Sequence, residues 1–258
     1  MDFKGSGTAG TAVSAGLRKQ AKLAWDGVLD LVYPPHCLVC ERHARPPLCE
    51  DCTAHFAPIP EPVCAVCGRP VEGDAPCRHC AGAPEAGGWG FDTARGAAIY
   101  EGALRHAIHR FKYGRMESLG EPLGAYLANR LVADALLSPP PPDLVIPVPI
   151  HASRERRRGF NQANVLAAPV AEMLGVPLRP GLLVRTRKTP PQVGLAPEAR
   201  RSNLADAFTV PGASELAGRR VLLIDDVFTT GSTVSACARA LKEAGAASVR
   251  VATLAAGG

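Results

Sequence analysis

The feature that most constrains the fold is the stretch 221–233, VLLIDDVFTTGST. It opens with four consecutive apolar residues, which predict a strand buried on both faces of a parallel sheet. Two carboxylates, Asp225 and Asp226, come next, followed by a turn of hydroxyl residues and glycine and by an Ala-rich segment, 234–247, that we expect to be helical. The free N–H groups and the positive dipole end of a helix N-terminus attract phosphate. The stretch therefore predicts a phosphate-binding turn with two carboxylates beside it.

Adjacent carboxylates at the end of a strand suit the hydroxyls of a sugar attached to that phosphate, or a Mg²⁺ ion bound beside it. The alternative is a strand–turn–helix unit in which the acidic pair only caps the helix. The coincidence of an apolar run, a double acid and a hydroxyl–glycine turn favours a binding site. The stretch has no Gly-Lys-Ser/Thr sequence, so it lacks the lysine that a P-loop NTPase requires.

The cysteines form the second constraint, because eight of the nine fall into four Cys-x-x-Cys pairs. Each pair can hold one side of a tetrahedral Zn²⁺, so four pairs predict two structural zinc ions. The simplest pairing is sequential, with the first four cysteines on one ion and the last four on the other, while a cross-braced pairing stays open. The ninth cysteine, Cys237, is expected to be a small core residue. The eight expected zinc ligands are Cys37, Cys40, Cys49, Cys52, Cys64, Cys67, Cys77 and Cys80.

Charge is spread unevenly along the chain, whose formal net charge is +5. Residues 151–220 hold 12 Lys and Arg against 5 Asp and Glu. Such an excess fits a polyphosphate or a nucleic-acid backbone, although a solvated basic surface is the simpler alternative. Residues 36–83 hold 4 Arg against 6 acids, and eight thiolates with two Zn²⁺ change their net charge from −2 to −6. The cysteine region is therefore expected to contact protein or to act as a scaffold.

The domain organisation follows from these patterns. We expect a tail over 1–15, a helix over 16–35 that Pro34-Pro35 ends, a double zinc ribbon over 36–83 and a second domain over 91–258. The apolar runs are far shorter than the roughly 20 residues that span a bilayer, and no secretory signal precedes the ribbon. We therefore predict a cytoplasmic protein without membrane insertion.

Within the second domain, strands are expected to alternate with helices. Basic and amide residues directly follow the apolar run 144–150, and such side chains behind a strand end suit pyrophosphate because guanidinium groups clamp phosphate oxygens in bidentate fashion. The alternative is a basic helix start that faces water. We expect 148–158 to be a loop whose cations oppose the dipole of the following helix, so that a bound anion would help. A long polar excursion follows from 185 to 203, which favours a lid or binding loop over simple disorder. The other expected strands are 91–100, 182–184, 207–210, 221–224 and 248–254, and the expected helices are 102–113, 121–137, 162–174 and 234–247.

Over about residues 28–256 the chain resembles the ComF family, competence-type phosphoribosyltransferase-like proteins with a double zinc ribbon in front. The stretch 221–233 resembles the 5-phosphoribosyl-1-pyrophosphate (PRPP) fingerprint of type I phosphoribosyltransferases. The resemblance implies an α/β fold, a type I phosphoribosyltransferase-like parallel sheet flanked by helices and preceded by a small double zinc ribbon. The other pieces that carry it are the cysteine pairs, Pro147-Val-Pro149, Arg158-Gly-Phe-Asn-Gln162, Gln192, and Arg200 with Asn203.

The resemblance also implies roles for individual residues. Asp225 and Asp226 would hold the ribose hydroxyls of PRPP, with Mg²⁺ beside them, and Arg154 would help to bind the pyrophosphate. The catalytic set would consist of the two aspartates with Arg158, Arg185 and Arg200. The 5′-phosphate would be held by Thr229, Thr230, Gly231, Ser232 and Thr233.

Two functional hypotheses of different class follow. The first is an enzyme that transfers phosphoribosyl from PRPP to an unidentified nitrogen acceptor. Since only residues 255–258 follow the last expected strand, an acceptor pocket would have to come from 91–120 or from the zinc module. The second is a non-catalytic adaptor in DNA uptake, which would bind single-stranded DNA or a DNA-processing protein through the basic segment.

Overall fold

The fold described below is that of a computed structural model. The tail expected at 1–15, the helix expected before Pro34-Pro35 and nearly all of the expected lid lie outside the described part of the chain. The described residues are 34–44, 47–73, 77–81, 88–132, 140–187 and 207–257.

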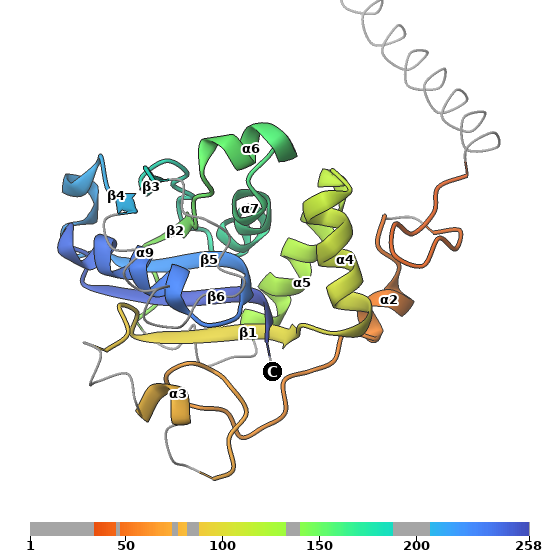
Figure 1. Ribbon diagram of the computed structural model, residues 1–258, viewed down its shortest axis with the longest axis horizontal. Coiled ribbons are helices and arrows are strands. Elements are labelled where there is room, and N and C mark those ends of the chain that lie inside the picture. Colours follow the sequence, from red (N-terminus) through yellow and green to blue (C-terminus); the bar gives the residue numbers. More distant parts are fainter. Residues whose placement is uncertain are drawn as a thin grey trace, which may run out of the picture.

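The centre of the molecule is a sheet of four parallel strands in the order β1-β6-β5-β2 (Figure 1). Its strands are β1 (Thr93–Ile99), β2 (Leu144–Pro147), β5 (Arg220–Phe228) and β6 (Ser248–Ala256). The two central strands, β5 and β6, are buried on both faces over most of their length, as parallel strands covered by helices must be. The expected parallel sheet is confirmed.

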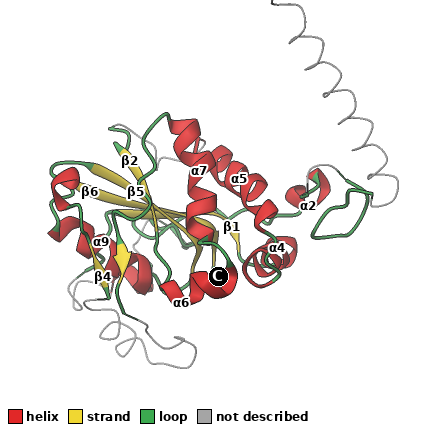
Figure 2. Cartoon of the chain, turned by 90° about the horizontal axis from the view of Figure 1, so that it is seen from above, coloured by secondary structure: helices red, strands yellow, loops and turns green. Residues whose placement is uncertain are grey.

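Helices cover both faces of this sheet (Figure 2). On β5, Leu222 and Ile224 pack in the same buried cluster as α4, α5 and α7, whereas Leu223 packs in the cluster that contains α9. This alternation follows from the two-residue period of a strand. No helix of the described segments is both long enough and apolar enough to cross a membrane. The larger helices are α4 (Gly102–Tyr113), α5 (Gly120–Val132), α6 (Ala152–Arg158), α7 (Gln162–Leu174) and α9 (Ser232–Glu243), and short 3₁₀ turns cover Glu117–Leu119 and Ala213–Leu216.

The chain segments that follow β2 lie on both sides of that strand. From β2 the chain passes through α7 to Leu178, which forms a parallel bridge with Val145 on the outer side of β2. It then returns to β5, which pairs with the other side of β2. In open parallel sheets the crevice for a ligand forms where successive connections leave in opposite directions. The fold therefore places a crevice between the ends of β2 and β5.

A separate two-stranded antiparallel sheet lies beside α9. It pairs β3 (Val184–Arg185) with β4 (Phe208–Thr209), close to the strand segments expected at 182–184 and 207–210. The antiparallel pair brings together the two ends of the excursion whose residues 188–206 lie outside the described part of the chain. Arg185 is thereby fixed at the edge of the crevice.

The segment 148–158 corrects one expectation. It was expected to be a loop, but residues 152–158 form the helix α6, which ends at Gly159 with a left-handed φ of 94°. Its last arginines thus lie at a helix C-terminus, where the dipole stabilises cations. The expectation that these arginines oppose the dipole of α7 is wrong. Asn161 lies between α6 and α7 and caps α7, since its side chain accepts a hydrogen bond from Ala163 N–H at 3.1 Å.

The two cysteine ribbons dock on different faces of the sheet. Around the first, α2 (Glu50–Ala54) contacts α4, and Phe56 packs edge-on against Tyr126 of α5 with ring centroids 5.0 Å apart. The second, which includes α3 (Arg78–Ala81), shares a buried cluster with Phe91 and α9. Figure 1 shows α2 beside α4 and α3 below β1.

The free edge of β1 is covered by the chain between the two cysteine clusters and by the first loop of the second cluster. Ala94 N–H donates to the carbonyl of Val66 at 2.7 Å, and Ile99 N–H donates to the carbonyl of Ala57 at 2.8 Å. These bonds satisfy edge groups that would otherwise be available to another chain. The ribbons are therefore part of the same folded unit as the sheet.

Replacing Phe56 with Ala should lower the free energy of unfolding by about 3 kcal/mol, because the side chain is buried and the cavity cannot close around the first ribbon. Urea unfolding of the zinc-loaded protein measures this. Met173→Ala, at a half-exposed position on α7, is the control and should change stability by less than about 0.5 kcal/mol. An unchanged unfolding midpoint for Phe56→Ala would contradict docking of the ribbon on α5.

Candidate active site at the ends of strands β2 and β5

The two carboxylates of the central stretch lie inside β5 rather than after it, since the strand continues to Phe228. Asp225 accepts a hydrogen bond from the backbone N–H of Asp226 at 2.8 Å. Burial and the neighbouring charge of Asp226 raise the pKa of Asp225 to about 7, and the nearby cations Lys112 and Arg185 offset this only in part. Asp225 can therefore exchange a proton for a cation or a hydrogen-bond donor near neutral pH.

Lys112 pairs directly with this acidic pair. Its Nζ lies 2.7 Å from Oδ1 of Asp226, and the two side chains are only 16% and 14% exposed. Burial alone would lower the pKa of Lys112, but the charge and hydrogen bond of Asp226 raise it. Sequence analysis assigned Lys112 no role, although its four-residue spacing from Leu104 and Ile108 places it on the buried face of α4.

The hydroxyl–glycine turn connects β5 to α9 as predicted. Gly231 has a φ of 75°, and a Cβ atom there would lie 2.8 Å from the Phe228 ring, so only glycine fits. The hydroxyls of Thr230 and Ser232 are 3.0 Å apart, and α9 begins at Ser232, two residues earlier than expected. A small cavity of about 30 Å³, lined by Asp225 and residues 227–234, lies within the turn. The turn that we expect to bind phosphate thus lies at the N-terminus of a 12-residue helix.

The arginines that we expect in the site have different partners in the structure. Arg185 stacks over the Phe208 ring at 5.4 Å, and burial lowers its pKa although its charge still acts on Asp225. Arg154 is close enough to Arg185 to repel it. Arg158 donates to Oε1 of Gln162 at 2.6 Å and lies 5.2 Å over the ring of Tyr113, so it faces α4 rather than the aspartates. Arg200 falls outside the described residues.

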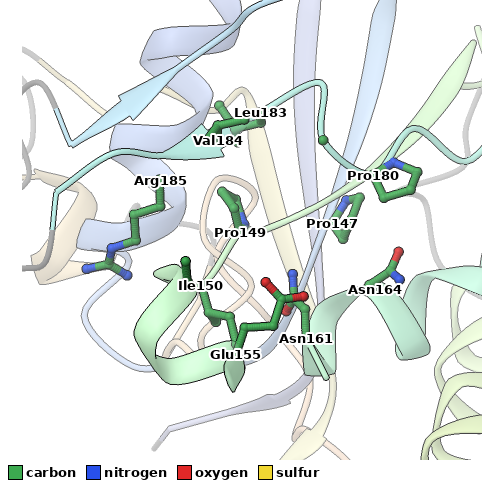
Figure 3. Close-up of a pocket in the computed structure, with 12 residues that line it drawn as sticks. Pro147, Pro149, Ile150, Glu155, Asn161, Asn164, Pro180, Leu183, Val184 and Arg185 are labelled. Carbon is green, nitrogen blue, oxygen red and sulfur yellow. The ribbon is translucent and has the colours of Figure 1, made fainter. Parts of the chain in front are cut away.

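A larger cavity of about 290 Å³ opens beside the end of β2 (Figure 3). Its walls include three prolines and several aliphatic residues. Arg185 also lines this cavity, and its charge acts on Asp225. The buried Oδ1 of Asn164 accepts no hydrogen bond from the described residues. Neither 91–120 nor the ribbons contribute to its lining. The lining residues are Pro147, Pro149, Ile150, Ala152, Glu155, Asn161, Asn164, Pro180, Gly181, Leu183, Val184 and Arg185.

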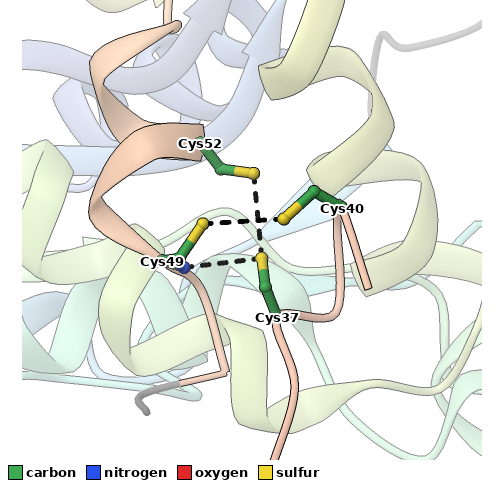
Figure 4. Close-up of side chains that lie close together, drawn as sticks. All are labelled: Cys37, Cys40, Cys49 and Cys52. Carbon is green, nitrogen blue, oxygen red and sulfur yellow. Dashed lines mark hydrogen bonds between the residues drawn. The ribbon is translucent and has the colours of Figure 1, made fainter. Parts of the chain in front are cut away.

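The cysteines form two separate clusters of four, each with its sulfur atoms within 4.8 Å of one another. In the first, Cys37 and Cys52 sulfurs are 3.7 Å apart, as are those of Cys40 and Cys49 (Figure 4). A tetrahedral Zn²⁺ with bonds of about 2.3 Å requires sulfur separations of roughly 3.8 Å, so the site fits the ion. Sequential pairing is confirmed, and cross-bracing is excluded.

Electrostatics also favour metal binding at the first cluster. Hydrogen bonds from the backbone and the guanidinium of Arg42 lower the pKa of the Cys40 thiol to about 6. Thiolates are the form that binds zinc. Within the described ranges, both clusters consist of cysteines alone.

The parallel sheet and the two cysteine clusters together define the class of protein: a phosphoribosyltransferase-like domain that follows two zinc ribbons in the chain. Family comparison agrees, since residues 28–81 match the double zinc ribbon domain and residues 160–258 match the phosphoribosyl transferase domain. The chain belongs to the ComF family of competence and DNA utilization proteins.

Individual relatives support this membership. Competence protein F of Haemophilus influenzae is 32% identical over 220 residues, which cover 84% of this chain and 93% of that protein. DNA utilization protein YhgH of Escherichia coli O157:H7 is 32% identical over 217 residues, or 83% and 87% of the two chains. Among solved structures, glutamine PRPP amidotransferase from B. subtilis aligns with 52% of this chain and 26% of that chain, at 24% identity and a TM-score of 0.35, a likeness too weak to add to these matches.

Purified protein should contain two Zn²⁺ ions per chain, and the Cys64→Ser/Cys67→Ser double variant should contain one, because the two clusters share no sulfur. Elemental analysis with a thiol count measures both. Cys237→Ser is the matched control and should retain two ions, since Cys237 is buried in α9 away from the clusters. Loss of both ions from the double variant would contradict independent sites.

Lys112→Met should destabilise the protein by about 1–3 kcal/mol at pH 8, because two carboxylates then face each other without their cation. The loss should shrink at pH 5, below the pKa of about 7 for Asp225, where that carboxyl is protonated and the repulsion is relieved. Urea unfolding at both pH values measures the difference. Lys242→Met, which breaks the more exposed Lys242–Asp92 pair, should cost less than about 1 kcal/mol. Equal losses for the two variants would contradict a special role for Lys112.

Proposed function

We propose that this protein binds PRPP with Mg²⁺ and transfers its phosphoribosyl group to a nitrogen acceptor. The observation that carries the proposal is the placement of a buried carboxylate pair and a phosphate cradle at one strand end, within nine residues of chain. A protein that only bridges partners has no physical need for two adjacent carboxylates at a strand end, one of which, Asp225, has its pKa raised to about 7. The family matches agree with this class of ligand.

Each part of the site has a role in this proposal. The turn formed by Thr229, Thr230, Gly231, Ser232 and Thr233 holds the 5′-phosphate through its N–H groups and hydroxyls. Asp225 and Asp226 hold the two ribose hydroxyls, and Asp226 exchanges its bond to Lys112 for one to the ligand. Arg185 and the neighbouring Arg154 bind the pyrophosphate. Arg200 is assigned to the catalytic set from the sequence resemblance alone, and Arg158 joins it only if its side chain leaves Gln162 and Tyr113.

The chemistry follows from charge. The bond from C1 of the ribose to pyrophosphate breaks, a bond from C1 to the acceptor nitrogen forms, and the nitrogen releases its proton to pyrophosphate or water. Bound Mg²⁺ would neutralise the departing pyrophosphate, with Asp225 and Asp226 as its nearest carboxylate ligands. The protein fixes the sugar against the turn, and buried cations near β5 stabilise the leaving group.

A second candidate function is an adaptor in DNA uptake that binds single-stranded DNA or a DNA-processing protein. Its support comes from relatives named for competence and DNA utilization. The surface also offers an aromatic ring, Tyr113, which is 60% exposed and lies under the guanidinium of Arg158. Bases stack on such rings, and arginines bind the backbone.

The decisive experiment is calorimetric titration of PRPP with Mg²⁺ into the zinc-loaded protein. Wild type should bind, and Asp225→Asn/Asp226→Asn should bind more than about tenfold more weakly, since it loses the charged acceptors of the hydroxyls. Affinity should rise from pH 6 to pH 8, because Asp225, with a folded pKa of about 7, must release its proton to act as an acceptor. Absence of binding by folded, zinc-loaded wild type would refute the proposal.

Glu215→Gln removes an exposed carboxylate outside the site and should bind as wild type does. The adaptor hypothesis predicts instead that single-stranded DNA binds and that its affinity falls steeply with salt. Binding of DNA without binding of PRPP would favour the adaptor.

A further inference from the structure

The two zinc clusters are built by two copies of one chain path, 27 residues apart from Cys37 to Cys64. In the first copy Cys37 N–H donates to the carbonyl of Arg42 at 2.8 Å, and in the second Cys64 N–H donates to that of Arg69 at 2.7 Å. The flanking bridges repeat at the same offset, His36 with His43 and Val63 with Pro70. Arg42 and Arg69 are therefore structurally equivalent.

The two arginine side chains nevertheless have different partners. Arg42 stays within its own ribbon, where it pairs with Asp51 at 2.8 Å and both side chains are about two-thirds exposed. Arg69 reaches into the second domain and donates a hydrogen bond to the backbone carbonyl of Thr229, the first residue of the phosphate turn. Its guanidinium also lies 5.9 Å over the ring of Phe228. One copy of the repeat thus contacts the proposed phosphate site.

The residue before each arginine explains the difference. Gly68 has a φ of 69°, and a Cβ atom there would lie 2.6 Å from the carbonyl oxygen of Ala94, so glycine lets the second ribbon seat directly on β1. The equivalent residue of the first ribbon is Glu41, with a φ of 62° and a side chain that pairs with Arg110 of α4 at 2.9 Å. The close approach at Gly68 directs Arg69 toward the turn.

Aromatic packing connects the same two regions. Trp89 stacks on Phe91 at 5.3 Å, and Phe91 meets the ring of Phe228 at 6.0 Å. Trp89 also lies against Gly231, where an added Cβ atom would come within 3.1 Å of the indole. Three cysteines of the second cluster belong to the buried cluster that contains Phe91 and Phe228. The second ribbon and the phosphate turn therefore share one core.

We propose that Arg69 positions the phosphate turn, so that the second zinc ribbon is a structural part of the phosphate-binding site. The proposal rests on the proposed function, because it deepens the same site. The C=O and N–H of a trans peptide point in opposite directions. By holding the Thr229 carbonyl toward the ribbon, Arg69 directs the N–H of Thr230 away from the ribbon, and its positive charge favours an anion in the turn.

The test compares two ligands and two equivalent arginines. Ribose 5-phosphate probes the turn, and inorganic pyrophosphate probes the basic side of the crevice. Arg69→Met should weaken ribose 5-phosphate binding about tenfold, the effect of losing a charged hydrogen bond, and should leave pyrophosphate binding and the two Zn²⁺ ions unchanged. Arg42→Met should bind both ligands as wild type does, and Arg69→Lys should recover part of the affinity because it can still donate to the carbonyl.

A second measurement does not depend on ligands. Hydrogen exchange of the amides 229–234 should be faster in Arg69→Met than in wild type or Arg42→Met. Unchanged exchange together with unchanged ribose 5-phosphate affinity would overturn the inference, as would an equal loss of affinity for both ligands, which indicates general misfolding. If wild type binds neither ligand, the proposed function fails, and the exchange rates alone decide whether Arg69 positions the turn.

Discussion

The contact on which the site depends is the largely buried ion pair between one ammonium and one carboxylate, with a second carboxylate beside it. Lys112 reaches from α4 to Asp226 at the end of β5, and Asp225 lies beside them without a dedicated cation. Desolvated charges are stable only when they are paired, so this arrangement fixes the distance between α4 and the central strand. Burial and the neighbouring charge of Asp226 raise the pKa of Asp225 to about 7, and the charge of Lys112 offsets this only in part.

Local sequence patterns predicted most of the fold. The apolar run before Asp225 predicted β5, and α4 and α7 have the expected bounds because their apolar spacing and flanking residues are unambiguous. The four Cys-x-x-Cys pairs predicted two clusters, but spacing alone could not decide their pairing, which depends on how each ribbon folds back on itself. The helix α6 was missed because its run of arginines has no buried face to give a helical period.

The site could be predicted only where it is contiguous in sequence. The carboxylates and the phosphate turn lie within one βα unit, so the order of residues along the chain is enough to predict that they lie together. Lys112 and Arg69 are 114 and 160 residues from the groups that they contact. The spacing of Lys112 along α4 indicates its buried face but not its partner, and no local pattern indicates the partner of Arg69. Their roles arise from tertiary packing of α4 and of the second ribbon against the end of β5.

The bonds along β1 have a consequence for how the protein can be divided. Ala57, between the two clusters, and Val66, within the second ribbon, accept hydrogen bonds from N–H groups of β1, so this part of the chain acts as a fifth, irregular partner of the sheet. A fragment that began near residue 91 would keep every strand of the sheet but expose this edge together with the apolar side of Phe91. Such a fragment would tend to associate through β1. The zinc ribbons therefore protect the phosphoribosyltransferase-like domain from association with other copies through β1.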